Sequence, residues 1–206
     1  MTRKVFFGGS FDPPHSGHLG VARAAIASGK CDMVVWFPGF LPPHKQTAKR
    51  APFADRLEMV KLLIADEPQM QVSDLENRLQ MVPSYTLNIL RKLREDSGET
   101  YQLLIGADSL SNLHTWYHAQ ELVSEFGIIT YPRDGYLVTE EQLQKNWDPQ
   151  TAEKLIKSII PGSFFKISST EVKFSMEKST DRHHIINSTG LTEEITEYIR
   201  KNNLYR

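Results

Sequence analysis

Two histidines lie three residues apart in a segment rich in glycine and proline near the start of the 206-residue chain. Residues 8–18 read Gly-Gly-Ser-Phe-Asp-Pro-Pro-His-Ser-Gly-His. The imidazoles of His15 and His18 can donate hydrogen bonds to one anion, and the glycines allow a tight bend close to a ligand. Each feature alone has an ordinary structural explanation: a turn between a strand and a helix, or a histidine satisfied in the core. Together they predict a phosphate-binding loop.

The flanking residues predict where this loop lies in the fold. Residues 3–7 are β-branched, aromatic or basic and predict a buried strand, and residues 19–27 have helical apolar spacing that ends before Gly29. The loop then follows the carboxyl end of a strand, where ligands bind in open α/β sheets. A helix that begins near residues 17–18 would present unpaired amides and its positive dipole end to a phosphate.

The complete pattern resembles the G-x-F-D-P-x-H-x-G-H signature of the nucleotidyltransferase superfamily, whose H-x-G-H element class I aminoacyl-tRNA synthetases share. Within that superfamily the chain is most similar to the nicotinate-nucleotide adenylyltransferase family. The resemblance implies an α/β fold with a Rossmann-like, doubly wound parallel sheet of the nucleotidyltransferase α/β phosphodiesterase type, in a single domain over residues 1–206. It implies catalytic roles for His15 and His18 and ATP contacts from the loop residues Gly8, Gly9, Ser10 and Phe11.

A second strand is predicted over residues 31–38, followed by Gly-Phe-Leu-Pro-Pro-His-Lys, and a helix over residues 54–65. Taken alone, Lys45 would be a solvated loop lysine. The family has P-P-H-K at this point, near the phosphates, so the resemblance implies that Lys45 binds the substrate. We expect a strand over residues 70–75 and a loop over 76–82. Pro-Ser-Tyr-Thr then opens a helix to about residue 94, with Ser84 as a plausible N-cap. The resemblance implies that Ser84, Tyr85 and Thr86 face the pyridine nucleotide.

The strand predicted over residues 101–105 runs into Gly106 and Asp108. Asp108 can accept hydrogen bonds from ribose hydroxyls or cap the next helix, and the resemblance assigns both residues to ATP. Trp116 and Tyr117 are either core aromatics or a stacking platform for the substrate, as the family pattern implies. Arg133 follows a strand over residues 126–132, and the resemblance implies that it contacts the mononucleotide phosphate.

The last predicted strand, residues 164–167, precedes Ser-Ser-Thr-Glu, whose spacing is that of a helix capping box. The resemblance implies a second phosphate clamp in I-S-S-T, with Ser169, Thr170 and Lys173 binding ATP and residues 168–206 forming a helical clamp region. Lys173 replaces the arginine of most relatives and lacks its planar fork. Helices are also expected within 138–160, broken at Asp148-Pro149, and over 191–201. The stretch 138–160 is either a covering segment or an oligomer contact.

The amino-acid composition gives no sign of a nucleic-acid or membrane partner. With 24 Lys and Arg against 25 Asp and Glu, nothing in the net charge suggests a nucleic acid or an anionic membrane as the main partner. Cys31 is the single cysteine, so no intrachain disulfide can form, and no apolar run reaches the length of a membrane span. We expect a cytoplasmic protein with no nucleic-acid or membrane partner, and a homo-oligomeric state is left open. The adjacent His183 and His184 are expected at the surface.

The resemblance implies transfer of the adenylyl group of ATP to nicotinate mononucleotide, which gives nicotinate adenine dinucleotide and pyrophosphate. The phosphate monoester is itself the nucleophile, so the protein must align the reactants and balance charge on the pyrophosphate. No carboxylate cluster for a protein-bound metal is evident, so Mg²⁺ is expected to arrive on the phosphates of ATP and pyrophosphate. The alternatives are an adenylyltransferase for nicotinamide mononucleotide or phosphopantetheine, and a non-catalytic nucleotide sensor. Pantetheine enzymes usually have threonine at the position of His15.

Overall fold

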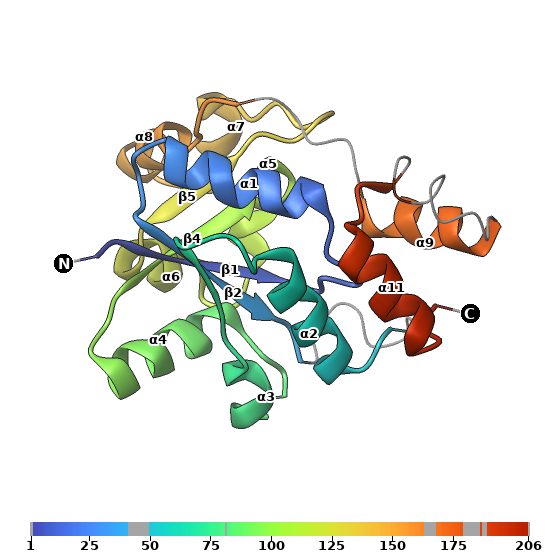
Figure 1. Ribbon diagram of the computed structural model, residues 1–206. Coiled ribbons are helices and arrows are strands. Elements are labelled where there is room, and N and C mark those ends of the chain that lie inside the picture. The colour runs from blue at the N-terminus through green and yellow to red at the C-terminus, as the bar shows by residue number, and fades with distance from the viewer. Residues whose placement is uncertain are drawn as a thin grey trace. The chain divides into compact units, whose positions relative to one another are not determined.

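A computed structural model describes residues 2–40, 50–80, 82–162, 168–178, 186 and 189–205 (Figure 1). The strands β1 (Lys4–Gly9), β2 (Met33–Pro38), β3 (Met70–Val72), β4 (Tyr101–Gly106) and β5 (Ile128–Tyr131) form one sheet in the order β3-β2-β1-β4-β5. β1 pairs in parallel with β4, with Lys4 opposite Tyr101, and β4 pairs in parallel with β5. This is the strand order of a doubly wound sheet, so the predicted fold class is confirmed.

The chain divides into two compact units that share β1, β2 and helix α1 (Ser16–Ala27). Unit 1 comprises residues 1–7, 22–35 and 85–165, and unit 2 comprises residues 8–21, 36–84 and 166–206. The single domain over 1–206, with a clamp region at 168–206, stays a prediction. Among the described residues, no helix is long and apolar enough to cross a membrane.

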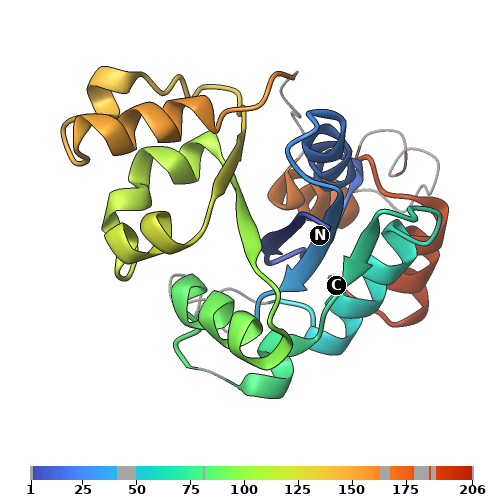
Figure 2. The same cartoon turned by 90° about the vertical axis from the view of Figure 1, so that its left-hand side faces the viewer.

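Unit 1 surrounds β4 and β5 with short helices. These are α4 (Thr86–Ser97), α5 (Ala107–Asn112), the 3-10 helix η1 (Leu113–Thr115), α6 (Ala119–Glu125), α7 (Glu140–Leu143) and α8 (Pro149–Lys157). α7 and α8 pack against each other (Figure 2). The break predicted at residues 148–149 is confirmed, because Asp148 caps α8 by accepting the Thr151 N–H and Pro149 occupies its first turn.

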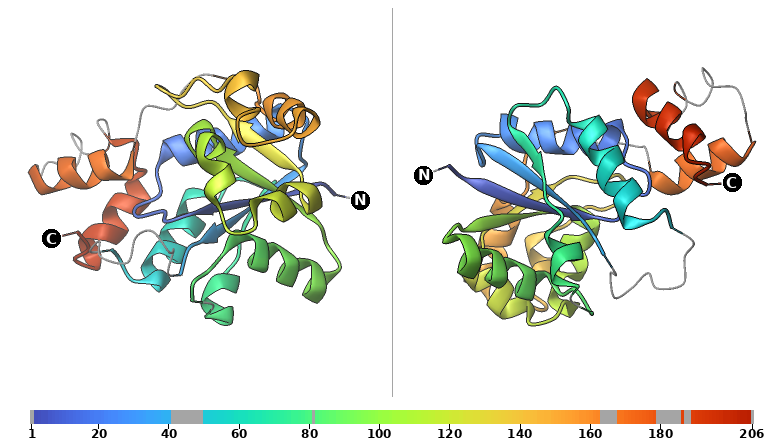
Figure 3. Two further views of the ribbon diagram at one scale, coloured as in Figure 1. Left: turned by 180° about the vertical axis from the view of Figure 1, so that it is seen from behind. Right: turned by 60° about the horizontal axis from the view of Figure 1, so that its bottom comes forward.

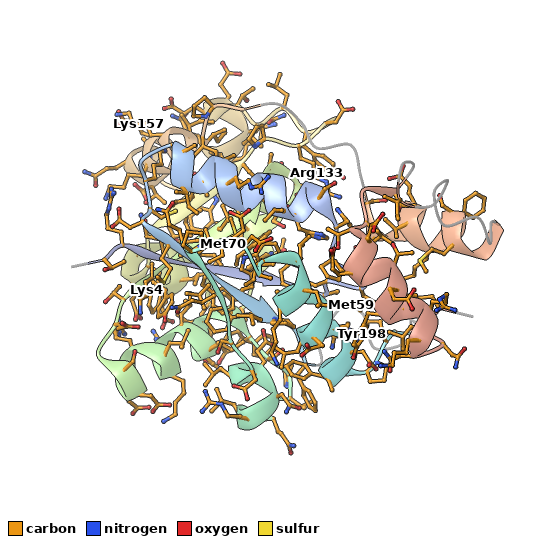
Figure 4. All side chains as sticks on the ribbon, in the orientation of Figure 1. Lys4, Met59, Met70, Arg133, Lys157 and Tyr198 are labelled. Carbon is orange, nitrogen blue, oxygen red and sulfur yellow. The ribbon has the colours of Figure 1, made fainter. Side chains whose placement is uncertain are left out.

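Unit 2 holds α2 (Phe53–Leu63), α3 (Leu75–Leu79), α9 (Ser169–Lys178) and α11 (Glu193–Lys201). α11 packs on α2 (Figure 3), and Met59 of α2 is completely buried. Tyr198 of α11 donates its hydroxyl hydrogen to Asp55 of α2 at 2.9 Å, and Tyr198 and Met59 are labelled in Figure 4. The C-terminal helix is therefore anchored by both apolar and polar contacts.

The structure corrects three local expectations. β3 ends at Val72, and residues 75–79 form α3 where we expected the end of the strand and a loop; Leu75 and Glu76 are buried, a tertiary effect that local composition does not reveal. Gly8 and Gly9 belong to β1, which runs two residues further than expected. Ser84 is not the N-cap of α4: Tyr85 is, and the Ser84 hydroxyl hydrogen-bonds Glu76.

Candidate active site

The loop after β1 is built around the buried ring of Phe11. Phe11 is 1 % exposed, has a φ of +46°, and packs on Trp36 with ring centroids 5.0 Å apart. Its ring also contacts His18 edge to face, at 5.2 Å and 76°. A Cβ on Gly9 would lie 2.8 Å from the Phe11 ring, so glycine is required where the ring covers the strand end. The aromatic packing therefore fixes both the loop and His18.

His18 has a defined hydrogen-bonding polarity. Its Nδ1 accepts the backbone N–H of His15 at 3.3 Å. In the neutral imidazole the proton must then be on Nε2, which makes Nε2 a donor. This supports a role for His18 as a hydrogen-bond donor to an anion.

His15 is a buried and neutral imidazole. Its side chain is 3 % exposed, and burial lowers its pKa from 6.5 to about 4. Its ring lies 3.9 Å from that of His18, and no described residue hydrogen-bonds its Nδ1. The predicted pair of histidines is therefore brought together, with a polar nitrogen of His15 unsatisfied.

The start of α1 is less open than expected. The Ser16 N–H donates to the Gly190 carbonyl at 2.8 Å, and the His18 N–H donates to the His15 carbonyl at 2.9 Å. The His18 amide, which we expected to be unpaired, and the preceding Ser16 amide are thus engaged within the protein. Side chains, more than these amides, are left to contact an anion at this loop.

The second predicted phosphate motif lies against the first loop within unit 2. The capping box forms as predicted, since Ser168 and Glu171 exchange hydrogen bonds at the start of α9. The Ser169 hydroxyl donates to the Pro13 carbonyl at 2.9 Å, and Thr170 is exposed. The motif and the loop are therefore joined directly, with Ser169 engaged and Thr170 open to solvent.

Asp12 is a buried carboxylate of the loop after β1 to which sequence reasoning assigned no role. It is 3 % exposed, and its carboxylate accepts hydrogen bonds from the Ala51 N–H at 3.0 Å, the Tyr205 hydroxyl at 2.7 Å and the Lys173 ammonium. Lys173 was predicted as an ATP ligand, and here it is the counterion of Asp12. The Asp of the F-D-P motif was a signal that could have drawn attention to this residue.

Arg56 is a second missed residue, and it ties three segments of unit 2 together. Arg56 is 2 % exposed, and its guanidinium donates to the carbonyls of Ser10 at 2.7 Å, Gly39 at 2.8 Å and Ala51 at 3.1 Å. Its position in an amphipathic helix gave no sign of burial. Arg56 positions the backbone at both ends of the segment that includes Lys45, and Lys45 itself lies outside the described residues.

Unit 1 contains the predicted site residues from Tyr85 to Arg133, and two of them form an ion pair. An Arg133 nitrogen lies 2.7 Å from a carboxylate oxygen of Asp108 (Arg133 is labelled in Figure 4). A Cβ on Gly106 would lie 2.3 Å from the Asp108 carboxylate and 3.0 Å from the Tyr131 ring, so a larger residue here would displace the Asp108 side chain. The residues predicted for ribose and for the mononucleotide phosphate are therefore neighbours.

Aromatic side chains gather at the start of α4. Tyr85 and Tyr117 stack with centroids 4.2 Å apart and planes 11° apart, and Tyr117 is 43 % exposed. Thr86 is the first residue of α4, and its N-cap Tyr85 makes no side-chain capping bond. Trp116 follows η1 and is half-buried. The structure thus places Tyr85 against Tyr117 beside the start of α4, and the stacking role of Trp116 stays a prediction.

Metal-binding side chains do not converge in the described part of the chain, where no group of three or more His, Cys, Asp or Glu could hold an ion. The two acidic residues of the site are each paired with a cation, Asp12 with Lys173 and Asp108 with Arg133. The predicted strand over 164–167 and the pair His183 and His184 lie outside the described residues.

Comparison with known proteins identifies the family. A family model described as cytidylyltransferase-like matches residues 6–174. The chain is 36 % identical to a probable nicotinate-nucleotide adenylyltransferase of Gloeobacter violaceus, over 98 % of this chain and 96 % of that protein. It is 32 % identical to one of Desulfotalea psychrophila, over 100 % of both chains.

Solved structures agree in fold. The nicotinic acid mononucleotide adenylyltransferase of Plasmodium falciparum, complexed with NaAD, matches with a TM-score of 0.78 and 22 % identity, over 100 % of this chain and 98 % of that chain. Strand order, the His15–His18 loop and the sequence matches all lead to one assignment. The chain belongs to the nicotinate-nucleotide adenylyltransferase family, within the cytidylyltransferase-like proteins.

Proposed function

We propose that the protein transfers the adenylyl group of ATP to nicotinate mononucleotide. A phosphate oxygen of the mononucleotide attacks the α-phosphorus of ATP, the bond from that phosphorus to the β-bridging oxygen breaks, and pyrophosphate leaves. The products are nicotinate adenine dinucleotide and pyrophosphate. Membership of the family supports the reaction, and the F-D-P-P-H-S-G-H loop supports it residue by residue.

The observation that carries the proposal is the hydrogen bond from the His15 N–H to His18 Nδ1. It places the proton of the neutral His18 imidazole on Nε2, the nitrogen that would donate to charge developing on the phosphates. His15 contributes a neutral imidazole, since burial keeps its pKa at about 4. On this account the protein needs no nucleophile of its own, and its work is to align two phosphates and stabilise the leaving group.

The remaining predicted contacts belong to this proposal. Gly8, Gly9, Ser10, Phe11, Ser169 and Thr170 would line the ATP phosphates, with Gly106 and Asp108 at the ribose. Ser84, Tyr85, Thr86, Trp116, Tyr117, Arg133 and Lys45 would contact the mononucleotide. The half-buried Trp116 would stack on the pyridine ring, and the helix start at Thr86 suits its anionic substituent.

Mg²⁺ is proposed to enter with ATP and to leave with pyrophosphate, where it would neutralise phosphate charge. The residues present fit this role better than that of a metal cage, because Asp12 and Asp108 already have cationic partners. The proposal keeps the cytoplasmic location expected from the sequence.

A pyrophosphate-release assay with ATP, Mg²⁺ and nicotinate mononucleotide tests the function, and mass spectrometry identifies the dinucleotide. We expect pyrophosphate and dinucleotide in equal amounts, and a large loss of both in His18→Ala. A folded wild-type protein that binds ATP and releases no pyrophosphate would show a nucleotide sensor in place of an enzyme.

A further inference from the structure

Asp12 joins the first loop to the C-terminal end of the chain. Its carboxylate accepts from the Tyr205 hydroxyl at 2.7 Å, across 193 positions of sequence, and from the Lys173 ammonium of α9. The Lys173 ammonium also lies 5.3 Å from the centre of the Tyr205 ring. Tyr205 therefore touches both partners of the buried ion pair.

The backbone after α11 holds Tyr205 in this place. The Leu204 N–H donates to the Ile199 carbonyl at 3.1 Å, and Asn203 and Tyr205 have φ values of +52° and +60°. These left-handed residues turn the chain back toward the loop after β1. Burial and the neighbouring Asp12 raise the pKa of Tyr205, so its phenol stays protonated and donates.

We propose that Tyr205 is a positioning residue for adenylyl transfer, which acts through Asp12 to orient the Lys173 ammonium toward the ATP phosphates. The inference rests on the proposed function only in taking ATP as the ligand. A lysine ammonium has three donors on a flexible stem, whereas arginine has a rigid fork. The contacts from Asp12 and Tyr205 supply the orientation that the lysine stem lacks.

The electrostatic balance explains why the Tyr205 hydroxyl matters. With it, one oxygen of Asp12 has two neutral donors, the Ala51 N–H and the phenol, and the other oxygen takes one donor of Lys173. Without the phenol, the buried carboxylate loses a donor and must attract the ammonium more strongly. Lys173 would then have less capacity to bind a phosphate.

The test compares two tyrosines of the same C-terminal segment. Tyr205→Phe removes the hydroxyl bound to Asp12, and Tyr198→Phe removes a matched hydroxyl bound to Asp55 at 2.9 Å. Calorimetry measures the Kd of each variant for a non-hydrolysable ATP analogue with Mg²⁺. We expect a rise of about tenfold for Tyr205→Phe, within the range for coupled residues of one network, and less than twofold for Tyr198→Phe.

A second background isolates the role of Lys173. In Lys173→Arg the planar fork can bind Asp12 bidentately and orient itself, so adding Tyr205→Phe should change the analogue's Kd by less than twofold. A tenfold change that persists in the arginine background would overturn the inference, as would equal Kd values for the wild type and Tyr205→Phe.

These titrations contain no mononucleotide, so they are independent of turnover. Absence of pyrophosphate release from the wild type would overturn the proposed function. The Kd values of the wild type and Tyr205→Phe would still test the role of Tyr205. A wild type that did not bind the analogue would overturn the role inferred for Tyr205.

Discussion

Replacing Gly9 with alanine tests whether the aromatic packing of the loop positions His18. The added Cβ would lie 2.8 Å from two carbon atoms of the Phe11 ring and 3.2 Å from a third. Ordinary carbon contacts are about 3.5–4.0 Å, so the ring or the strand end must move by nearly 1 Å. Phe11 is 1 % exposed and packs on Trp36, so it has little room on that side.

The expected cost follows from this geometry. Overpacking in a tight core costs about 1–3 kcal/mol of the free energy of unfolding, or about 2–4 °C in Tm per kcal/mol for a chain of this size. Movement of the Phe11 ring displaces His18, which it contacts edge to face. A shift of about 1 Å in a positioning group can lower kcat about a hundredfold.

The assays are denaturant unfolding and pyrophosphate release at saturating substrates. Gly127→Ala is the matched control, because its Cβ would meet the flexible end of Gln102 at 3.0 Å, remote in sequence from the loop. We expect that control to lose less than about 1 kcal/mol and to keep its kcat. Wild-type stability and kcat in Gly9→Ala would refute the packing argument.

Three further predictions concern single titratable residues. His18→Ala should lower kcat by about two to four orders of magnitude with little change in the urea midpoint, because a preorganised donor is lost; unchanged turnover would remove His18 from the site. For His15, unfolded chains take up a proton near pH 6.5 but the folded protein only near pH 4, so acidification through that window should cost about 3 kcal/mol of stability. His15→Gln should lose that part of the pH dependence, and an identical profile would contradict the burial argument. Burial raises the pKa of Glu76 to about 7, so the free energy of unfolding should fall as the pH rises from 4.5 to 7. Urea titrations at several pH values should show a smaller fall for Glu76→Gln than for the wild type. The same pH dependence in both proteins would contradict the burial of Glu76.

Most of the sheet could be predicted from the sequence, because its strands are buried apolar runs between turn-forming residues. β4 at Tyr101–Gly106 and the helix break at Asp148 are examples where local chemistry decides the structure. α3 could not be predicted, because its five residues are helical through the tertiary burial of Leu75 and Glu76. Short helices have little intrinsic stability, so packing decides whether they form.

The candidate site also contains residues that the sequence predicts and contacts that it could not predict. Motif spacing was enough to find His15 and His18, and the structure adds the neutral tautomer of His18 and the lowered pKa of His15. The partners of Lys173 could not be predicted, because Asp12 and Tyr205 are distant in sequence and meet only in the folded chain. The sequence predicted a phosphate ligand at residue 173, and the structure shows an ion pair there.

Selection of an acid mononucleotide over its amide depends on the contacts expected near Thr86 and Tyr117. Backbone N–H donors there, together with the dipole of the 12-residue α4, would favour a carboxylate. An amide would leave one donor unpaired, at about 1–3 kcal/mol, and would also lose the charge-assisted bonds.

The most direct measurement is kcat/KM for nicotinate and nicotinamide mononucleotides, side by side, with ATP and Mg²⁺. Loss of the pairing and of the charge together predicts a preference for the acid of about a hundredfold or more. Trp116→Ala should weaken both substrates and leave this ratio nearly unchanged, because stacking does not read the charge of the substituent. A wild-type ratio near one, or a preference for the amide, would contradict the nicotinate assignment.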